Sequence, residues 1–269
     1  MNRPLRTAWR PWSWAFLTVL ALLGCATPPG GQGERDITTA SDETEAQKRA
    51  RIRLELASAY FAQGQARTAL DEIKQALQAD PNSPQAYNLR GLVYSNLGED
   101  RLAEESFRRA LQLDGRDADA RHNYGWFLCN QRRYRESYAQ FDAALAIPQY
   151  REPTKTLLAK GVCQARAGEL ADAEATLMKS YEMDPGNPAT AMNLAAVLHR
   201  RGDYERARFY VRRVNAVPQL VNAESLWLAA RIEHKLGNRG GARDFGEQLR
   251  RRFPGSREAA AFEQGRYDE

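Results

Sequence analysis

The sequence predicts an all-α protein in which six helical hairpins stack into a right-handed superhelical solenoid. Three observations predict it. A small residue recurs at the same place in six consecutive segments of about 34 residues. A glycine follows seven residues later in five of the six, and a turn residue stands near the end of four. An ordinary helical bundle would not hold one register over about two hundred residues, so the repeat takes precedence over other interpretations.

The six repeats carry the marks of two antiparallel helices joined by a tight turn. They span residues 50–83, 84–117, 118–151, 154–187, 188–221 and 223–256. Position 8 is small in each repeat, at Ala57, Gly91, Gly125, Gly161, Ala195 and Ala230. Small residues here and at position 20 let the two helices approach closely. Position 15, where a left-handed residue ends the first helix, is glycine except at Arg132: Gly64, Gly98, Gly168, Gly202 and Gly237.

Two further positions define the second helix of each repeat. A bulky residue at position 24, with Gly246 as the exception, is expected to fill the space between repeats: Ile73, Phe107, Phe141, Leu177 and Val211. Position 32 ends the helix in four repeats, at Pro81, Gly115, Pro185 and Pro254. This is the tetratricopeptide pattern. We expect the solenoid to cover residues 45–263, with a short capping helix over 257–262 and a polar, frayed tail at 264–269.

Residues 1–24 have the features of a secretory signal peptide. Arginines precede an apolar run of 12 residues, 12–23, which is shorter than the roughly 20 that span a bilayer. The run ends in Leu22–Leu23–Gly24–Cys25, which resembles the lipobox of bacterial lipoproteins, where the chain is cut before a cysteine that carries the lipid. Ala26 in place of Asp then implies export to the outer membrane. The alternative is an ordinary signal peptide cut elsewhere, with Cys25 as a stray thiol.

Residues 25–44 are predicted to be a lipidated cysteine followed by a flexible linker. The stretch 27–33 is rich in Pro and Gly, and Thr, Ser, Asp and Glu dominate after it. The net charge of +5 falls to +2 without the three arginines of the leader, since 36 basic residues then face 34 acidic ones. Basic and acidic residues are interleaved along the predicted helices without a basic stripe, so the charge pattern argues against a nucleic-acid-binding protein.

The first helix of each repeat lines the concave face in tetratricopeptide solenoids. We therefore predict a groove for an extended or helical peptide. Its residues are Leu54, Phe61, Asn88, Leu92, His122, Trp126, Leu158, Val162, Met192 and Trp227. The alternative is that Leu54 and Phe61 pack against the preceding segment and Trp227 against the cap. A weaker hypothesis is a carboxylate clamp, which Asn123 and Lys155 match in part, although Ala159 stands where a base is needed.

The remaining cysteines, Cys129 and Cys163, form an even pair in an oxidising compartment. They lie on the first helices of neighbouring repeats, so a disulfide is within reach; two buried thiols are the alternative. The three histidines stand in three different repeats without metal-ligand spacing. The sequence holds no nucleophile motif and no phosphate loop. We predict a protein that is not an enzyme, with no metal, no cofactor and no small-molecule substrate.

A specific resemblance rests on the third repeat and on the end of the chain. The stretch Asn123–Tyr124–Gly125–Trp126–Phe127–Leu128–Cys129, followed by Arg133–Tyr134 and Glu136–Ser137–Tyr138, resembles the type IV pilus biogenesis and stability lipoproteins, the pilotins of the pilus secretin. Residues 249–256 with Glu258 are also similar to theirs, as are the leader, the linker and the six repeats. The resemblance thus covers nearly the whole chain.

That resemblance implies a lipid-anchored protein on the periplasmic face of the outer membrane. Such proteins bind the secretin and promote its localisation and multimerisation, on which pilus biogenesis and twitching motility depend. Two other functions stay open from the residues alone. One is a general periplasmic scaffold for outer-membrane protein assembly or for recruiting cell-wall hydrolases, and the other is a regulatory subunit of an envelope enzyme.

Overall fold

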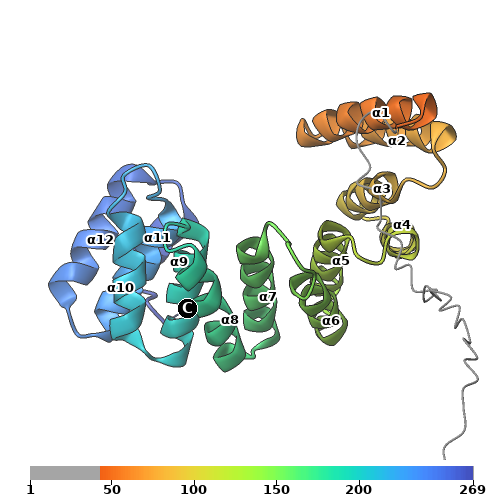
Figure 1. Ribbon diagram of the computed structural model, residues 1–269. Helices are drawn as coiled ribbons and strands as arrows, with labels where there is room; N and C mark the ends of the chain where they lie inside the picture. The colour runs from red at the N-terminus through yellow and green to blue at the C-terminus, as the bar shows by residue number, and fades with distance from the viewer. Residues whose placement is uncertain (1–42, 269) are drawn as a thin grey trace, which may run out of the picture. The chain divides into compact units, whose positions relative to one another are not determined.

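The computed structural model describes residues 43–268, and within this range it is built from helices without strands (Figure 1). The leader, Cys25 and nearly all of the predicted linker lie outside the described residues. The helices are α1 (Glu45–Ala62), α2 (Ala66–Ala79), α3 (Pro84–Asn96), α4 (Asp100–Leu113), α5 (Ala118–Asn130), α6 (Tyr134–Leu145), α7 (Pro153–Ala167), α8 (Leu170–Met183), α9 (Pro188–Arg201), α10 (Tyr204–Asn215), α11 (Ala223–Lys235), α12 (Arg239–Arg252) and α13 (Arg257–Glu263). None of these is long and apolar enough to cross a membrane.

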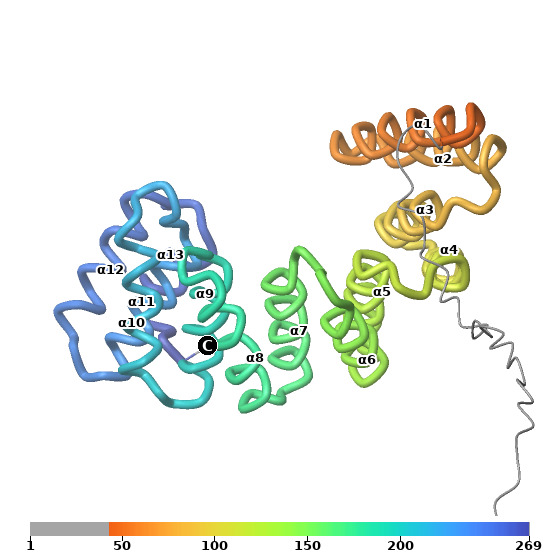
Figure 2. Tube along the Cα trace, viewed as in Figure 1, coloured from red at the N-terminus to blue at the C-terminus, as the bar shows by residue number. Residues whose placement is uncertain are grey.

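The helices pair in chain order, α1 with α2 through α11 with α12, and each pair is one predicted repeat (Figure 2). Each odd-numbered helix also contacts the next odd-numbered one, whereas among the described residues the even-numbered helices make no such contacts. The odd-numbered helices are therefore packed more closely and form the inner face of the curved stack. These observations confirm the predicted all-α tetratricopeptide solenoid.

The turns between paired helices have the predicted left-handed residue at position 15. The five glycines at position 15 adopt φ between 76° and 85°, the left-handed conformation that only glycine enters without a steric cost. Arg132 takes the same conformation, with φ 60°. Most of the odd-numbered helices start at a side-chain cap, such as Asp117 before α5 and Asn187 before α9, which satisfies free backbone N–H groups.

The helical glycines at position 8 make room for the bulky residue at position 24 of the same repeat. A Cβ added to Gly125 would lie 2.8 Å from the ring of Phe141, and one on Gly161 would lie 2.6 Å from Leu177. Repeat 1 instead combines an alanine with a smaller β-branched residue, Ala57 with Ile73, in one buried cluster. The two positions are thus matched in size, which explains why a glycine, costly inside a helix by about 1 kcal/mol, recurs there.

The last repeat fills this space in a different way. Gly246 lacks a bulky side chain, and a Cβ on it would collide with the ring of Phe262 from α13. The capping helix therefore supplies the ring that the repeat itself does not have. The predicted frayed tail is wrong for residues 264–268, because the ring of Tyr267 lies on those of Trp227 and His234 and buries apolar surface that would otherwise face water.

Candidate partner groove

Four of the ten predicted groove residues line one depression on the inner face of repeats 3 and 4. The residues of this central pocket are His122 and Trp126 from α5, Lys155, Leu158, Ala159 and Val162 from α7, and Asn193 from α9. The depression measures about 420 Å³, within the size range of ligand pockets in proteins. The three helices meet here because consecutive odd-numbered helices are in contact.

His122 is part of the wall of the central pocket and is buried. Its Nδ1 lies 2.9 Å from the hydroxyl oxygen of Thr156, which in turn lies 2.7 Å from that of Tyr150. Burial, and secondarily the charge of Lys155, lowers the pKa of His122 to about 4. The imidazole is therefore neutral near pH 7, and its contribution to the pocket is an uncharged wall held in place by hydrogen bonds.

The cation of the central pocket is Lys155. Its ammonium group donates to the Glu152 carboxylate at 2.8 Å, and this hydrogen bond raises the pKa of Lys155. Both side chains are about half exposed, so the pair is well solvated and contributes little to stability. An apolar depression with one solvated cation among its lining residues suits a segment that has an apolar side chain close to a carboxylate.

Trp126 is the largest side chain of the central pocket, and it is half-buried. The guanidinium of Arg166 lies over its ring, 4.8 Å from the ring centroid, and donates to the Asn130 side-chain oxygen at 2.9 Å. The indole is thus held between two repeats before any partner arrives. An aromatic ring fixed in this way is a binding surface with little conformational entropy left to lose.

Four predicted groove residues from repeats 1 and 2 lie outside the central pocket. Leu54 and Phe61 pack against the buried cluster of repeat 1, and Leu92 packs against the cluster that contains Phe107. The Asn88 side-chain oxygen accepts a hydrogen bond from Asn123 at 3.1 Å. Asn123 is therefore engaged with α3 and does not join Lys155 in the pocket, as the carboxylate clamp would require.

The last two predicted groove residues have different surroundings. Met192 lines a second depression of about 360 Å³ between repeats 5 and 6. Trp227 is only 8% exposed and belongs to the cluster of the capping helix, so its prediction as an open groove residue is wrong. Asn193, in contrast, was not among the predicted groove residues. Asn193 stands at position 6 of repeat 5, next to position 5, which faces the groove. This neighbourhood is the signal that could have identified it.

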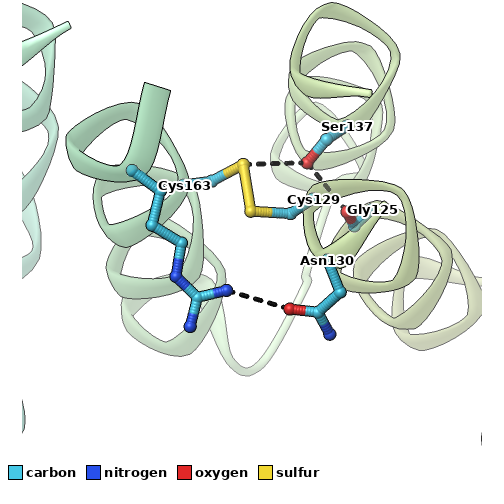
Figure 3. The surroundings of a disulfide bond; sticks show 6 residues. Gly125, Cys129, Asn130, Ser137 and Cys163 are labelled. Carbon is cyan, nitrogen blue, oxygen red and sulfur yellow. Dashed lines mark hydrogen bonds between the residues drawn. A yellow bond between two sulfur atoms is a disulfide. The ribbon is translucent and has the colours of Figure 1, made fainter. Parts of the chain in front are cut away.

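A disulfide joins the two helices that carry most of the central pocket (Figure 3). The Cα atoms of Cys129 in α5 and Cys163 in α7 are 5.9 Å apart, within the span of a disulfide, and both residues are buried. Beside them the Ser137 hydroxyl donates to the Gly125 carbonyl at 2.8 Å. The bridge constrains the spacing of α5 and α7, and with it the width of the pocket.

Removing this bridge should lower the free energy of unfolding by about 3–4 kcal/mol, since it closes a loop of 34 residues. The comparison is between oxidised and reduced protein carrying Cys25→Ser, by denaturant titration. Free-thiol labelling of the denatured, oxidised protein should find no reactive thiol. The double variant Cys129→Ser/Cys163→Ser is the control, because reductant should leave its stability unchanged. Two reactive thiols in the oxidised protein would exclude the bridge.

Comparison with known proteins identifies the repeat family along most of the solenoid. Family models described as tetratricopeptide repeat match residues 84–117, 128–188 and 164–220, and one described as TPR repeat matches residues 57–98. The match to residues 84–117 covers the helix pair α3 and α4, and the other matches overlap helices α1 to α10 of the solenoid.

Two relatives extend the likeness to nearly the whole chain. The type IV pilus assembly protein PilF of Pseudomonas aeruginosa is 32% identical over 248 residues, covering 92% of this chain and 96% of that protein. The solved structure of PilF from Pseudomonas aeruginosa covers 82% of this chain and all of its own, at 29% identity and a TM-score of 0.72. The crystal structure of PilW, a widely conserved type IV pilus biogenesis factor, covers 79% of this chain and 97% of its own, at 34% identity and a TM-score of 0.75. Since the likeness runs through nearly the full length in both sequence and fold, this chain belongs to the PilF/PilW family of tetratricopeptide-repeat proteins of type IV pilus biogenesis.

Proposed function

We propose that this protein is an outer-membrane lipoprotein that binds the type IV pilus secretin through the inner face of its solenoid. Binding promotes localisation of the secretin in the outer membrane and its multimerisation, and hence pilus biogenesis and twitching motility. Membership of the PilF/PilW family supports the role in pilus biogenesis. The single observation that carries the secretin-binding part is the central pocket, an apolar depression with a fixed tryptophan on a rigid scaffold.

The central pocket suits a protein segment for three physical reasons. Four of its lining side chains, Trp126, Leu158, Ala159 and Val162, are apolar, and their burial against a partner displaces water with a gain in free energy. Its tryptophan is of the residue type that most often dominates binding free energies in protein interfaces. Its shape is preformed by the disulfide and by the contact between Arg166 and Trp126. The conformational entropy lost on binding is therefore mainly that of the partner segment.

The proposed lipid on Cys25 attaches the protein that carries this binding surface to the outer membrane. Confinement of protein and secretin subunits to one membrane raises their effective concentration. The lipid and the groove therefore have separable tasks, the first setting the place and the second selecting the partner.

Replacing Trp126 by alanine should weaken secretin binding by about tenfold or more, the usual effect of truncating a central interface tryptophan. The protein should stay folded, because Trp126 is only partly buried and packs against the core cluster from outside it. Binding is measured by titration with the purified periplasmic part of the secretin. Secretin multimers and piliation are scored in cells that carry the variant.

The matched control is Phe209→Ala, which removes an aromatic ring that is 54% exposed on the even-numbered helix α10. This change should leave secretin binding unaffected. Unchanged binding and piliation in Trp126→Ala would exclude the central pocket as the secretin site. Weakened binding in Phe209→Ala alone would instead place the site on the outer surface.

A further inference from the structure

The inner face of the last repeat is covered by a segment of the chain itself. After α13 the residue Gly265 takes a left-handed conformation, with φ 67°, and residues 266–268 leave the helical path. The ring of Tyr267 then stacks on the imidazole of His234, with centroids 4.2 Å apart and planes 4° apart. It also lies 5.3 Å from the ring of Trp227. Residues 267 and 268 thus rest on α11 in a non-helical conformation.

The polar contacts of this segment are those of a bound peptide. The Arg231 Nε donates to the backbone carbonyl of Tyr267 at 3.0 Å, and Lys235 forms an ion pair with the Asp268 carboxylate. The α11 residues involved, Trp227, Arg231, His234 and Lys235, stand at positions 5, 9, 12 and 13 of the repeat. Positions 5 and 9 of repeats 3 and 4 shape the central pocket. The tail therefore occupies, in repeat 6, the surface that repeats 3 and 4 leave open.

We infer that the inner face of α11 is a recognition site for an aromatic residue followed by a carboxylate, and that Tyr267–Asp268 occupies it as a displaceable plug. The inference rests on the proposed use of the inner face for binding proteins, but not on the identity of the partner. The rings of Trp227 and His234 form an aromatic slot that selects the aromatic side chain, and Lys235 selects the carboxylate. Arg231 binds a backbone carbonyl, which any sequence provides. The partner class is a protein segment with this aromatic–acidic pair.

The plug is held weakly enough to be displaced. Its ion pair joins a lysine side chain that is 34% exposed to an aspartate side chain that is 74% exposed, and such pairs contribute little. Its position depends mainly on the ring of Tyr267, which is half-buried. Because the segment is tethered, its local concentration is in the millimolar range. A competing segment in solution must overcome that advantage unless the tail is released.

The test measures binding of a labelled peptide, Glu-Gln-Gly-Arg-Tyr-Asp-Glu, to the full chain by fluorescence anisotropy. This peptide copies residues 263–269. The Tyr267→Ala chain should bind it at least about tenfold more tightly than the wild-type chain, because its own tail no longer fills the slot. Tyr267→Phe is the matched control and should behave like wild type, since the ring makes the contacts with Trp227 and His234. A peptide with alanine in place of tyrosine should not bind, and Lys235→Glu added to Tyr267→Ala should weaken binding.

A folded Tyr267→Ala chain that binds the peptide no better than wild type would overturn the inference and leave the tail as a structural cap. Circular dichroism establishes whether that variant is folded. If it loses helical signal, Asp268→Lys decides instead, because it replaces the exposed ion pair with two like charges and leaves the ring of Tyr267 in place. Asp268→Lys should then bind the peptide more tightly than wild type, and no gain would overturn the inference. The peptide assay contains no secretin, so its failure leaves the proposed function standing, while intact secretin binding by Trp126→Ala would defeat the central pocket alone.

Discussion

The Phe141→Ala variant should lose about 3–5 kcal/mol of its free energy of unfolding, the usual cost of removing a buried phenylalanine ring. Phe141 is fully buried and belongs to the same cluster as Cys129 and Cys163. Its ring lies against Gly125 and 5.8 Å from the ring of His122. Since Gly125 has no side chain that could move into the space, the cavity would stay open. Denaturant titration of the oxidised protein measures the loss.

Two variants make this prediction specific. Phe209→Ala is the same chemical change at an exposed ring and should shift the free energy of unfolding by less than about 0.5 kcal/mol. The double variant Gly125→Ala/Phe141→Ile copies the pair Ala57 and Ile73 of repeat 1 and should be more stable than Phe141→Ala. A loss below about 1 kcal/mol in Phe141→Ala would show that size matching between positions 8 and 24 does not stabilise the solenoid.

The Cys25→Ser variant should shift the protein from the membrane fraction to the soluble fraction. A lipid anchor contributes about 0.8 kcal/mol per buried CH₂ group, so its loss removes the whole of the proposed membrane attachment. The solenoid should keep its helical signal and its thermal unfolding midpoint, because Cys25 precedes the folded residues 44–268. Cell fractionation with immunodetection measures the shift, and the number of secretin multimers should fall in parallel.

Ala26→Asp provides the matched variant for the anchor. It keeps Cys25 but places an aspartate at the position that, by resemblance to bacterial lipoproteins, retains such proteins at the inner membrane. The protein should remain membrane-bound and change membranes on a density gradient. Persistent membrane association of Cys25→Ser would contradict the lipid anchor, and an unchanged distribution of Ala26→Asp would contradict the proposed sorting to the outer membrane.

The repeat register could be predicted because each mark has a local physical cause. Gly64 and Gly168 occupy left-handed turns, and Gly91 and Gly125 face a ring of their own repeat. Each cause acts within one repeat, so the same residue types recur at the same positions of successive repeats, and this recurrence is what the sequence shows. Arg132 shows that the turn forms even without its glycine, because the flanking helix pair imposes it.

The burial of Trp227 under the C-terminal segment could not be predicted in the same way. Trp227 stands at an inward position, yet its exposure depends on Tyr267, forty residues later in a polar segment without any pattern. The signal that could have been used is Gly246, because a repeat that lacks its bulky residue needs a ring from elsewhere. Phe262 supplies that ring, and the helix that carries it also directs the tail toward α11.

The sequence by itself determined the number of repeats and the order of the helices, and the concave face then followed from the known geometry of tetratricopeptide solenoids. These follow from contacts within a repeat and between neighbouring repeats, which is how a solenoid is stabilised. Only the tertiary structure decided which inward residues are open to a partner. It gathers Trp126, Leu158 and Val162 into a pocket, leaves His122 neutral in its wall and covers Trp227 with the tail. Burial and access are properties of the whole surface around a side chain, so a one-dimensional pattern does not contain them.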